Sequence, residues 1–163
     1  MDEVITFLAE QNIKYRRYHH PAVYTVEEAA LHRQGMEEAT HTKNLFLKDS
    51  KQQQYYLLTT QARQQFRLNQ IRKTIRAKKL RLATEEELEE ILGLQAGSVS
   101  PFGLLNDQDH VVEFIISKSV WQAEKIAIHP NTNTQTIVLT GKDFQRCIRY
   151  LGYEPTILQI NQL

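Results

Sequence analysis

The stretch LFLKDSKQQQYYLLTT, residues 45–60, contains two apolar runs separated by a polar segment. Residues 45–49 and 55–60 have the length and side chains of strands, and DSKQQQ between them is typical of a turn. The pattern predicts a β-hairpin. Further along the chain, KIAIHP at 125–130 and TIVLT at 136–140 flank the polar NTNTQ. A second hairpin is predicted there for the same reason.

Helices are predicted on both sides of these hairpins. Apolar residues recur at helical spacing near the N-terminus, and two capping-box spacings, each a threonine three positions before a glutamate, mark further helix starts. The predicted helices are residues 3–12, about 26–34 after Thr25 and Glu28, a basic segment before residue 80, a segment opened by Thr84 and Glu87 and closed by Gly93, and a last helix capped by Thr140 and Asp143 that ends at Tyr150.

The remaining segments predict single strands and one structured loop. Residues 13–18, LRLA at 80–83 and VVEFII at 111–116 have the character of strands. LQAGSVSPFGLLND at 94–107 has the glycines, serines and proline of a loop. Helices grouped with several strand pairs predict a single α+β domain over residues 1–163, with a mixed, mostly antiparallel sheet flanked by helices.

The composition is that of an ordinary globular protein. A chain of 163 residues can form one domain, and its 41% hydrophobic and 24% charged residues lie close to average usage. The start MDEVITFLAEQ lacks the basic and apolar regions of a signal peptide, and no segment resembles a membrane helix. The single cysteine, Cys147, cannot form an internal disulfide and is expected in the core. We therefore expect a cytoplasmic protein that does not bind membranes.

Charge is unevenly distributed although the net charge is only +1. Residues 61–83 contain eight lysines and arginines and no acid, and five glutamates follow within 85–90. One interpretation is a pair of solvated helix faces of opposite charge. The other is a surface that contacts the phosphates of a nucleic acid.

Cofactor and metal motifs are absent from the sequence. There is no GxGxxG, no phosphate-binding GxxxxGK[ST], no HExxH and no paired cysteines. The six histidines are dispersed along the chain, a pattern more typical of surface and core histidines than of a metal site. The sequence therefore predicts that neither a metal nor an organic cofactor is required.

Four segments form a pattern when they are taken together and in order: HPAVYTVEEA at 20–29, HTKNLFLKD at 41–49, GSVSPFGLLND at 97–107 and IHPNTNTQTIVLTGKDF at 128–144. This pattern resembles the YbaK family, to which the editing (insertion) domain of prolyl-tRNA synthetase belongs, and within it the stand-alone prolyl-tRNA editing proteins. The resemblance covers nearly the whole chain. It implies a barrel-like mixed sheet of the YbaK/aminoacyl-tRNA synthetase-associated type.

The resemblance also implies which residues carry the reaction. Lys43 occupies the place of the family's essential lysine, and Asn44 beside it is expected to line the same site. Gly97 and Pro101 match a GxxxP pattern whose backbone amides face the terminal adenosine and the scissile ester. Ser98 is therefore expected, with Gly97, to belong to the catalytic group.

Further positions are expected to bind the substrate. By the resemblance, Val23 and Tyr24 fall where the wall of the amino-acid pocket lies, and His129 falls where family members hold the aminoacyl group. The basic segment is less securely part of the family pattern, and its contact with tRNA is inferred from its charge. The residues expected to make this contact are Arg72, Lys73 and Arg76.

The implied activity is hydrolysis, in trans, of alanine wrongly esterified to proline tRNA. The expected partner is the acceptor end of the mischarged tRNA(Pro), with prolyl-tRNA synthetase or an elongation factor as further partners and no role for DNA. Two alternatives stay open. One is a deacylase for tRNA mischarged with cysteine, serine or threonine, and the other is a non-catalytic module that binds tRNA or a synthetase.

The chemistry of an ester explains how such a site can work without a nucleophile of its own. An ester is already reactive, so the enzyme mainly positions a water molecule and stabilises the oxyanion that forms on attack. Backbone N–H groups at 97–101 can serve the oxyanion. The ammonium of Lys43 can bind the carbonyl oxygen or a nearby phosphate, or Lys43 can act as a base if its pKa is lowered. The sequence leaves these roles open.

Overall fold

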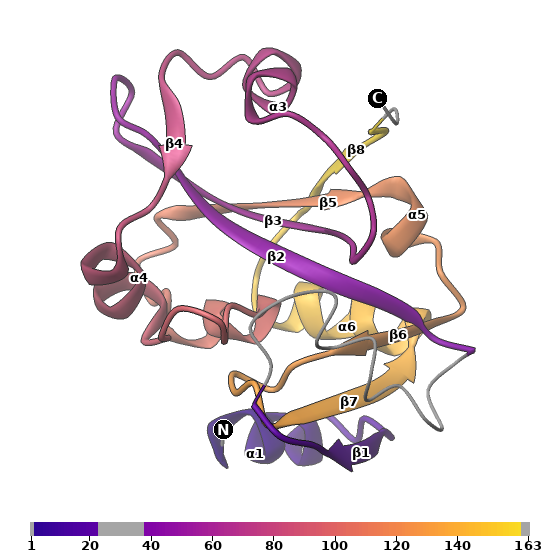
Figure 1. Ribbon diagram of the computed structural model, residues 1–163. Helices are drawn as coiled ribbons and strands as arrows, with labels where there is room; N and C mark the ends of the chain where they lie inside the picture. Colours follow the sequence, from indigo (N-terminus) through magenta and orange to yellow (C-terminus); the bar gives the residue numbers. More distant parts are fainter. Residues whose placement is uncertain (1, 23–37, 161–163) are drawn as a thin grey trace.

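The computed structural model describes residues 2–22 and 38–160 (Figure 1). Its strands are β1 (Arg16–His19), β2 (Thr40–Asp49), β3 (Gln54–Gln61), β4 (Leu80–Leu82), β5 (Val112–Ser117), β6 (Lys125–Ile128), β7 (Gln135–Thr140) and β8 (Thr156–Leu158). Its helices are α1 (Asp2–Glu10), α3 (Leu68–Thr74), α4 (Glu85–Leu92), α5 (Lys118–Trp121) and α6 (Gly141–Tyr150), with the 3-10 helix η1 at Pro101–Asn106.

The described strands form one mixed sheet in the order β1-β7-β6-β2-β3-β5-β8, with β4 paired to β2. Both predicted hairpins are present as antiparallel pairs, β2 with β3 and β6 with β7. The pairs β2–β6, β3–β5 and β5–β8 are parallel. The predicted α+β class with a mixed sheet is confirmed. Within the described residues the sheet stays open, because no strand pairing joins β1 to β8.

β2 connects the two halves of this sheet. Near its start it pairs with β6, through Thr40 and His41, and near its end it pairs with β4, through residues 47–49. Residues 43–45 between these two pairings have β3 on one side and no described partner strand on the other. In Figure 1, β2 runs diagonally between β3 and β5 above and β6 and β7 below. The middle of β2 is therefore open on one edge.

Two apolar clusters fill the two sides of β2 and β3. The larger cluster takes residues from α1, α4, η1, β5, β6, β7 and α6, and Phe46 contributes to it from β2. The smaller lies between Leu47 of β2 and the region of α3. Successive side chains of a strand point to opposite faces. Phe46 and Leu47 therefore define the two faces of β2, and residues 42 and 44 share a face with Phe46 while Lys43 shares one with Leu47.

Several local predictions are confirmed by the backbone contacts. Thr84 and Glu87 form both hydrogen bonds of a capping box at the start of α4, and Gly93 ends that helix with a left-handed φ of 65°. The hydroxyl of Thr140 accepts from the backbone N–H of Asp143 at the start of α6. These caps satisfy N–H groups that have no partner within the helix.

Other predictions needed correction. The first long strand begins at Thr40, so Lys43 lies inside it and not before it. The strand expected at 13–18 occupies Arg16–His19, and the basic segment forms a helix of only 7 residues. The loop at 94–107 contains η1, and the short elements α5 and β8 were not predicted. The helix expected at about 26–34 lies outside the described residues.

Candidate active site

Lys43 projects from the open middle section of β2. Its Nζ donates a hydrogen bond to the carbonyl of Gln64 at 2.6 Å and lies 5.0 Å from the ring centroid of Phe66. Partial burial lowers the pKa of Lys43 below its usual value of 10.5. An ammonium has three N–H donors, so the contact with Gln64 leaves two of them for a ligand.

Asn44 lies on the opposite face of β2 from Lys43. Its Oδ1 accepts a hydrogen bond from the hydroxyl of the buried Thr59, its direct neighbour on β3. Phe46 of the larger apolar cluster follows on the same face. The side chain of Asn44 therefore holds β2 to β3. Its expected contact with substrate stays a prediction.

The loop around Gly97 presents backbone amides. Gly97 has a φ of 88°, a left-handed conformation that favours glycine, and the N–H of Ser98 donates to the carbonyl of Gln95 at 3.0 Å. The amides of Gly97 and Val99 donate to no described residue, whereas the amide of Ser98 closes a turn.

Ser100 joins this loop to the end of β6, a contact that the sequence analysis missed. Its buried Oγ donates to the carbonyl of His129 at 2.6 Å and accepts from the N–H of Phe102 at 3.2 Å. Pro101 follows as the first residue of η1 and is itself buried. Ser before Pro is a helix-start signal, and it could have indicated the cap although not the contact with His129.

The ring of His129 has a defined hydrogen-bonding state. Its Nδ1 lies 2.9 Å from the backbone carbonyl of Gln135, and because a carbonyl only accepts, Nδ1 carries the proton. Burial lowers the pKa of His129 below 6.5, which favours the neutral ring at pH 7. The other nitrogen, Nε2, then has a free lone pair and can accept a hydrogen bond.

His129 and Lys43 both follow the short parallel pairing of β2 with β6. The parallel pairing of β2 with β6 matches Thr40 with Ile126 and His41 with Ala127. This pairing ends before Lys43, and β6 ends at Ile128, one residue before His129. The hydroxyl of Thr42, which donates to the carbonyl of Ala127 at 2.9 Å, holds the two strands together just before this point. The Thr42 and Ser100 hydrogen bonds thus join the end of β6 to β2 and to the loop at 97–101.

A second histidine, which the sequence analysis did not single out as a site residue, lies beside His129. The ring of His20 is 6.1 Å from that of His129, in an edge-to-face arrangement. Its Nε2 lies 2.9 Å from the hydroxyl of Thr136 on β7. The HP pair of residues 20–21 pointed to the family, but it did not indicate that His20 lies beside His129. Val23 and Tyr24, the expected pocket walls, lie outside the described residues.

The basic residues expected to contact tRNA differ from one another in their surroundings. Arg72 is half-buried and donates to the side chain of Asn69 at 2.8 Å and to the carbonyl of Ala77 at 3.2 Å. Lys73 and Arg76 are exposed. Arg72 therefore supports the turn after α3, whereas Lys73 and Arg76 present their charges to solvent.

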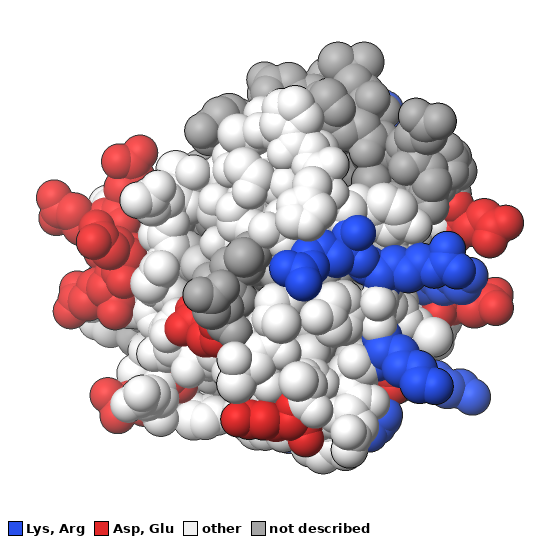
Figure 2. All heavy atoms as spheres, turned by 90° about the horizontal axis from the view of Figure 1, so that it is seen from below, with Lys and Arg blue, Asp and Glu red and all other residues white. Residues whose placement is uncertain are grey.

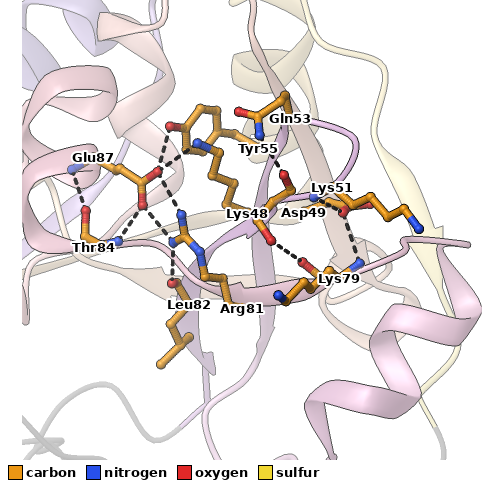
Figure 3. A network of polar contacts seen from close by, with 11 residues as sticks. Lys48, Asp49, Lys51, Gln53, Tyr55, Lys79, Arg81, Leu82, Thr84 and Glu87 are labelled. Atoms are coloured by element: carbon orange, nitrogen blue, oxygen red, sulfur yellow. Dashed lines mark hydrogen bonds and ion pairs between the residues drawn. The ribbon is translucent and has the colours of Figure 1, made fainter.

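Two carboxylates hold the basic segment against the rest of the fold (Figure 3). Asp49 is buried and accepts from the backbone N–H groups of Lys78 and Lys79 at 2.8 and 3.0 Å. Glu87 forms ion pairs with Arg81 at 2.8 Å and Lys48 at 3.1 Å, and these contacts lower its pKa. Part of the charge of the basic segment therefore forms ion pairs that hold β4 and α4 against the first hairpin.

The described residues contain no group of three or more histidine, cysteine or acidic side chains that could hold a metal ion. Cys147 is buried, and desolvation raises the pKa of its thiol to about 12, which opposes a role as nucleophile. None of the helices in the described part of the chain is long and apolar enough to cross a membrane.

Comparison with protein families places the site in context. Residues 20–147 match the profile of the aminoacyl-tRNA editing domain. The chain belongs to this family. The match includes β2 with Lys43, the loop at 97–101 and the β6–β7 hairpin with His129. Membership of the editing family agrees with the predicted resemblance and with the class of aminoacyl-tRNA deacylases.

Individual relatives agree with this assignment. The editing-family chain is 37% identical over 150 residues to the "Prolyl-tRNA editing protein ProX" of Acetoanaerobium sticklandii, covering 91% of this chain and 90% of that protein. It is 35% identical over 159 residues to the "Prolyl-tRNA synthetase associated domain-containing protein 1" of Bos taurus, covering 95% and 92% of the two chains.

Solved structures confirm the fold of the editing-family chain. One, described as a proposed trans-editing enzyme for prolyl-tRNA synthetase, superposes with a TM-score of 0.71 at 21% identity, covering 98% of this chain and 96% of that one. Another, of a hypothetical protein, gives a TM-score of 0.72 at 17% identity and covers 95% and 97%. At these identities the similarity concerns the fold.

Proposed function

We propose that this protein hydrolyses the ester between alanine and proline tRNA in trans, releasing alanine and free tRNA. The single observation that carries the proposal is the placement of Lys43. Its partly desolvated ammonium projects from the middle of β2, the strand that Thr42 joins to the segment before His129, in a chain whose relatives include a prolyl-tRNA editing protein. The substrate is the acceptor end of mischarged tRNA(Pro), and prolyl-tRNA synthetase or an elongation factor is the expected further partner.

The proposed reaction relies on stabilising charge and not on a protein nucleophile. Water attacks the ester carbonyl, and the negative charge that develops on the oxygen receives hydrogen bonds from the free donors of Lys43 and from the amides of Gly97 and Val99. The tRNA ribose oxygen leaves and takes a proton. Because Gly97 has no side chain, the ester can approach the backbone closely.

His129 is proposed to orient the amino acid. The α-ammonium of an aminoacyl ester is a hydrogen-bond donor, and the lone pair on Nε2 of neutral His129 is a matching acceptor. The contact with Ser100 fixes the backbone of His129 relative to the loop that serves the oxyanion. Amino-acid binding and charge stabilisation are thus built on connected segments.

Selection of alanine over proline is proposed to depend on size. A synthetase pocket shaped for proline cannot strongly reject alanine, because each methylene contributes only about 1–3 kcal/mol. A second, smaller pocket solves this problem, and Val23 and Tyr24 are its proposed walls. Val23→Ala is expected to allow cleavage of Pro-tRNA(Pro). If this variant left Pro-tRNA(Pro) intact while it still cleaved Ala-tRNA(Pro), Val23 would not form the wall.

The proposed activity is tested with Lys43→Ala and His129→Asn in a deacylation assay on Ala-tRNA(Pro). Loss of turnover with retained tRNA binding in Lys43→Ala supports catalysis and excludes a purely binding module. The alternative of a deacylase for cysteine, serine or threonine is tested by changing the amino acid on the same tRNA.

A further inference from the structure

We propose that Arg63 and Arg67 form a phosphate-binding site for the 3′ end of the tRNA, on the segment 62–67 beside Lys43. This inference rests on the proposed function, because it takes the ester-bearing end of the tRNA to lie at Lys43. It assigns the RNA contact nearest the ester to this segment and not to the C-terminal end of α3.

The segment is fixed directly against Lys43. The backbone N–H of Ala62 donates to the carbonyl of His41 on β2 at 2.8 Å. Gln64 is buried, and its carbonyl accepts from Nζ of Lys43. The ring of Phe66 lies against the same ammonium. Lys43 therefore contacts both Gln64 and Phe66. These two inward-facing residues are the neighbours of Arg63 and Arg67 in the chain.

The two arginines alternate with these inward residues and are exposed. None of the ion pairs formed among the described residues involves Arg63 or Arg67. Other arginines of the same basic run are engaged, since Arg81 pairs with Glu87 and Arg72 bonds to Asn69 and Ala77. The charges of Arg63 and Arg67 are thus available to a ligand that reaches the exposed side of the segment 62–67.

The chemistry of the tRNA end places an anion close to the ester. The amino acid is attached to the ribose of the terminal nucleotide, and the 5′ phosphate of that nucleotide lies one ribose away. With the ester carbonyl at Lys43, this phosphate lies at the edge of the group of residues that surround the lysine. The guanidinium group binds phosphate through paired N–H donors, so the two arginines match the group that must be there.

Basic side chains also gather on a different surface. Figure 2 shows a row of lysines and arginines on the face seen from below, where Figure 1 places α1 and β1. Arg17 of β1 is exposed, and in the antiparallel pairing of β1 with β7 its strand partner is the core residue Ile137. Arg17 lies on β1, at the edge of the sheet and away from the segment 62–67, and provides a matched control.

The test measures binding of uncharged tRNA(Pro), intact or lacking its terminal adenosine nucleotide, as a function of salt. Arg63→Gln with Arg67→Gln is expected to weaken binding of the intact tRNA and to reduce the slope of log K against log salt by about 0.7 for each phosphate that the variant no longer neutralises. Trimming removes the terminal phosphate. The double variant should then bind the trimmed tRNA as the native protein does, and Arg17→Gln should bind both RNAs normally.

Two outcomes would overturn the inference. If the double variant bound intact and trimmed tRNA equally weakly, the arginines would contact other phosphates. If Arg17→Gln weakened binding while the double variant bound as the native protein does, the RNA would lie on the β1 face. Circular dichroism of each variant establishes that it is folded. Because uncharged RNA is used, a native protein that shows the expected pattern without hydrolysing Ala-tRNA(Pro) would keep this phosphate site and reject the proposed function.

Discussion

The side chain of Lys43 is a partly buried ammonium that can donate hydrogen bonds and that loses its charge as pH rises. Burial lowers its pKa below 10.5, and the Gln64 carbonyl and the Phe66 ring both contact the charged form. If the ammonium stabilises the oxyanion, the enzymatic rate falls as pH rises through this lowered pKa.

The pH dependence is measured as kcat for Ala-tRNA(Pro) after subtraction of spontaneous hydrolysis. We expect a decline on the alkaline side that begins below pH 10.5 and is absent from Lys43→Arg, whose residual activity is small but whose charge persists. A rate that rises through the same range would instead show that Lys43 acts as a base.

Ser100 is the residue on which the geometry of the loop depends. Its hydroxyl both caps η1 and donates to the carbonyl of His129. Ser100→Ala should lower the free energy of unfolding by about 1–3 kcal/mol, because it leaves the partly buried carbonyl of His129 without this donor, and should lower kcat. Thermal unfolding of Ser98→Ala is the comparison, since no described contact uses the Ser98 hydroxyl. Equal stability of the two variants would contradict this role.

At the scale of elements, β2, β3, β4 and α4 are joined through Glu87. Its carboxylate contacts Lys48 and Tyr55 from the first hairpin, Arg81 of β4 and the backbone N–H of Thr84 at the start of α4 (Figure 3). Glu87→Gln should destabilise the fold by about 1–3 kcal/mol at pH 7. Glu86→Gln, a neighbouring exposed substitution on α4, should have little effect.

The contribution of Glu87 depends on pH in a defined direction. Because its folded-state pKa lies below the usual 4.5, its stabilisation is complete above about pH 4.5 and decreases as pH falls toward the folded-state pKa. Chemical unfolding of native protein and Glu87→Gln at about pH 7 and about pH 3 should show a smaller difference at the lower pH. A difference that grew at low pH would contradict the proposed role of the carboxylate.

Gly141, the first residue of α6, has no room for a side chain. A Cβ on Gly141 would lie 1.9 Å from the carbonyl oxygen of Ala123, and the Gly141 N–H already donates to Glu124 at 2.8 Å. Gly141→Ala should therefore cost about 1–3 kcal/mol through forced backbone movement. Thermal unfolding of Lys142→Ala, one residue later, should be close to native. A native-like Gly141→Ala would show that α6 can move.

At the scale of the whole molecule, local patterns predicted what local forces determine. Apolar runs separated by short polar segments predict the two hairpins, and the Thr84 capping box predicts the start of α4. The parallel pairings and β8 depend on contacts between segments far apart in sequence, which a local pattern does not contain. The strand containing Lys43 extends to Thr40 because polar residues there are paired with neighbouring strands.

The residues of the candidate site come from the resemblance, and their functional roles stay predictions. The resemblance pointed to Lys43, the loop at 97–101 and His129. The Ser100 hydrogen bond joins the last two, and the pairing of β2 with β6 lies just before Lys43. The opposite orientation of Asn44 and the link through Ser100 come from pleating and loop closure. The bonds that hold Arg72 could not be read from charge.

The central claim is tested most directly by deacylation of tRNA(Pro) charged separately with alanine, cysteine, serine or proline, with native protein and Lys43→Ala in parallel. We expect rapid loss of alanine alone, reduced roughly 100- to 1000-fold in Lys43→Ala, the range found when an oxyanion donor is removed. Preferential loss of another amino acid, no loss of any, or full activity in Lys43→Ala would contradict it.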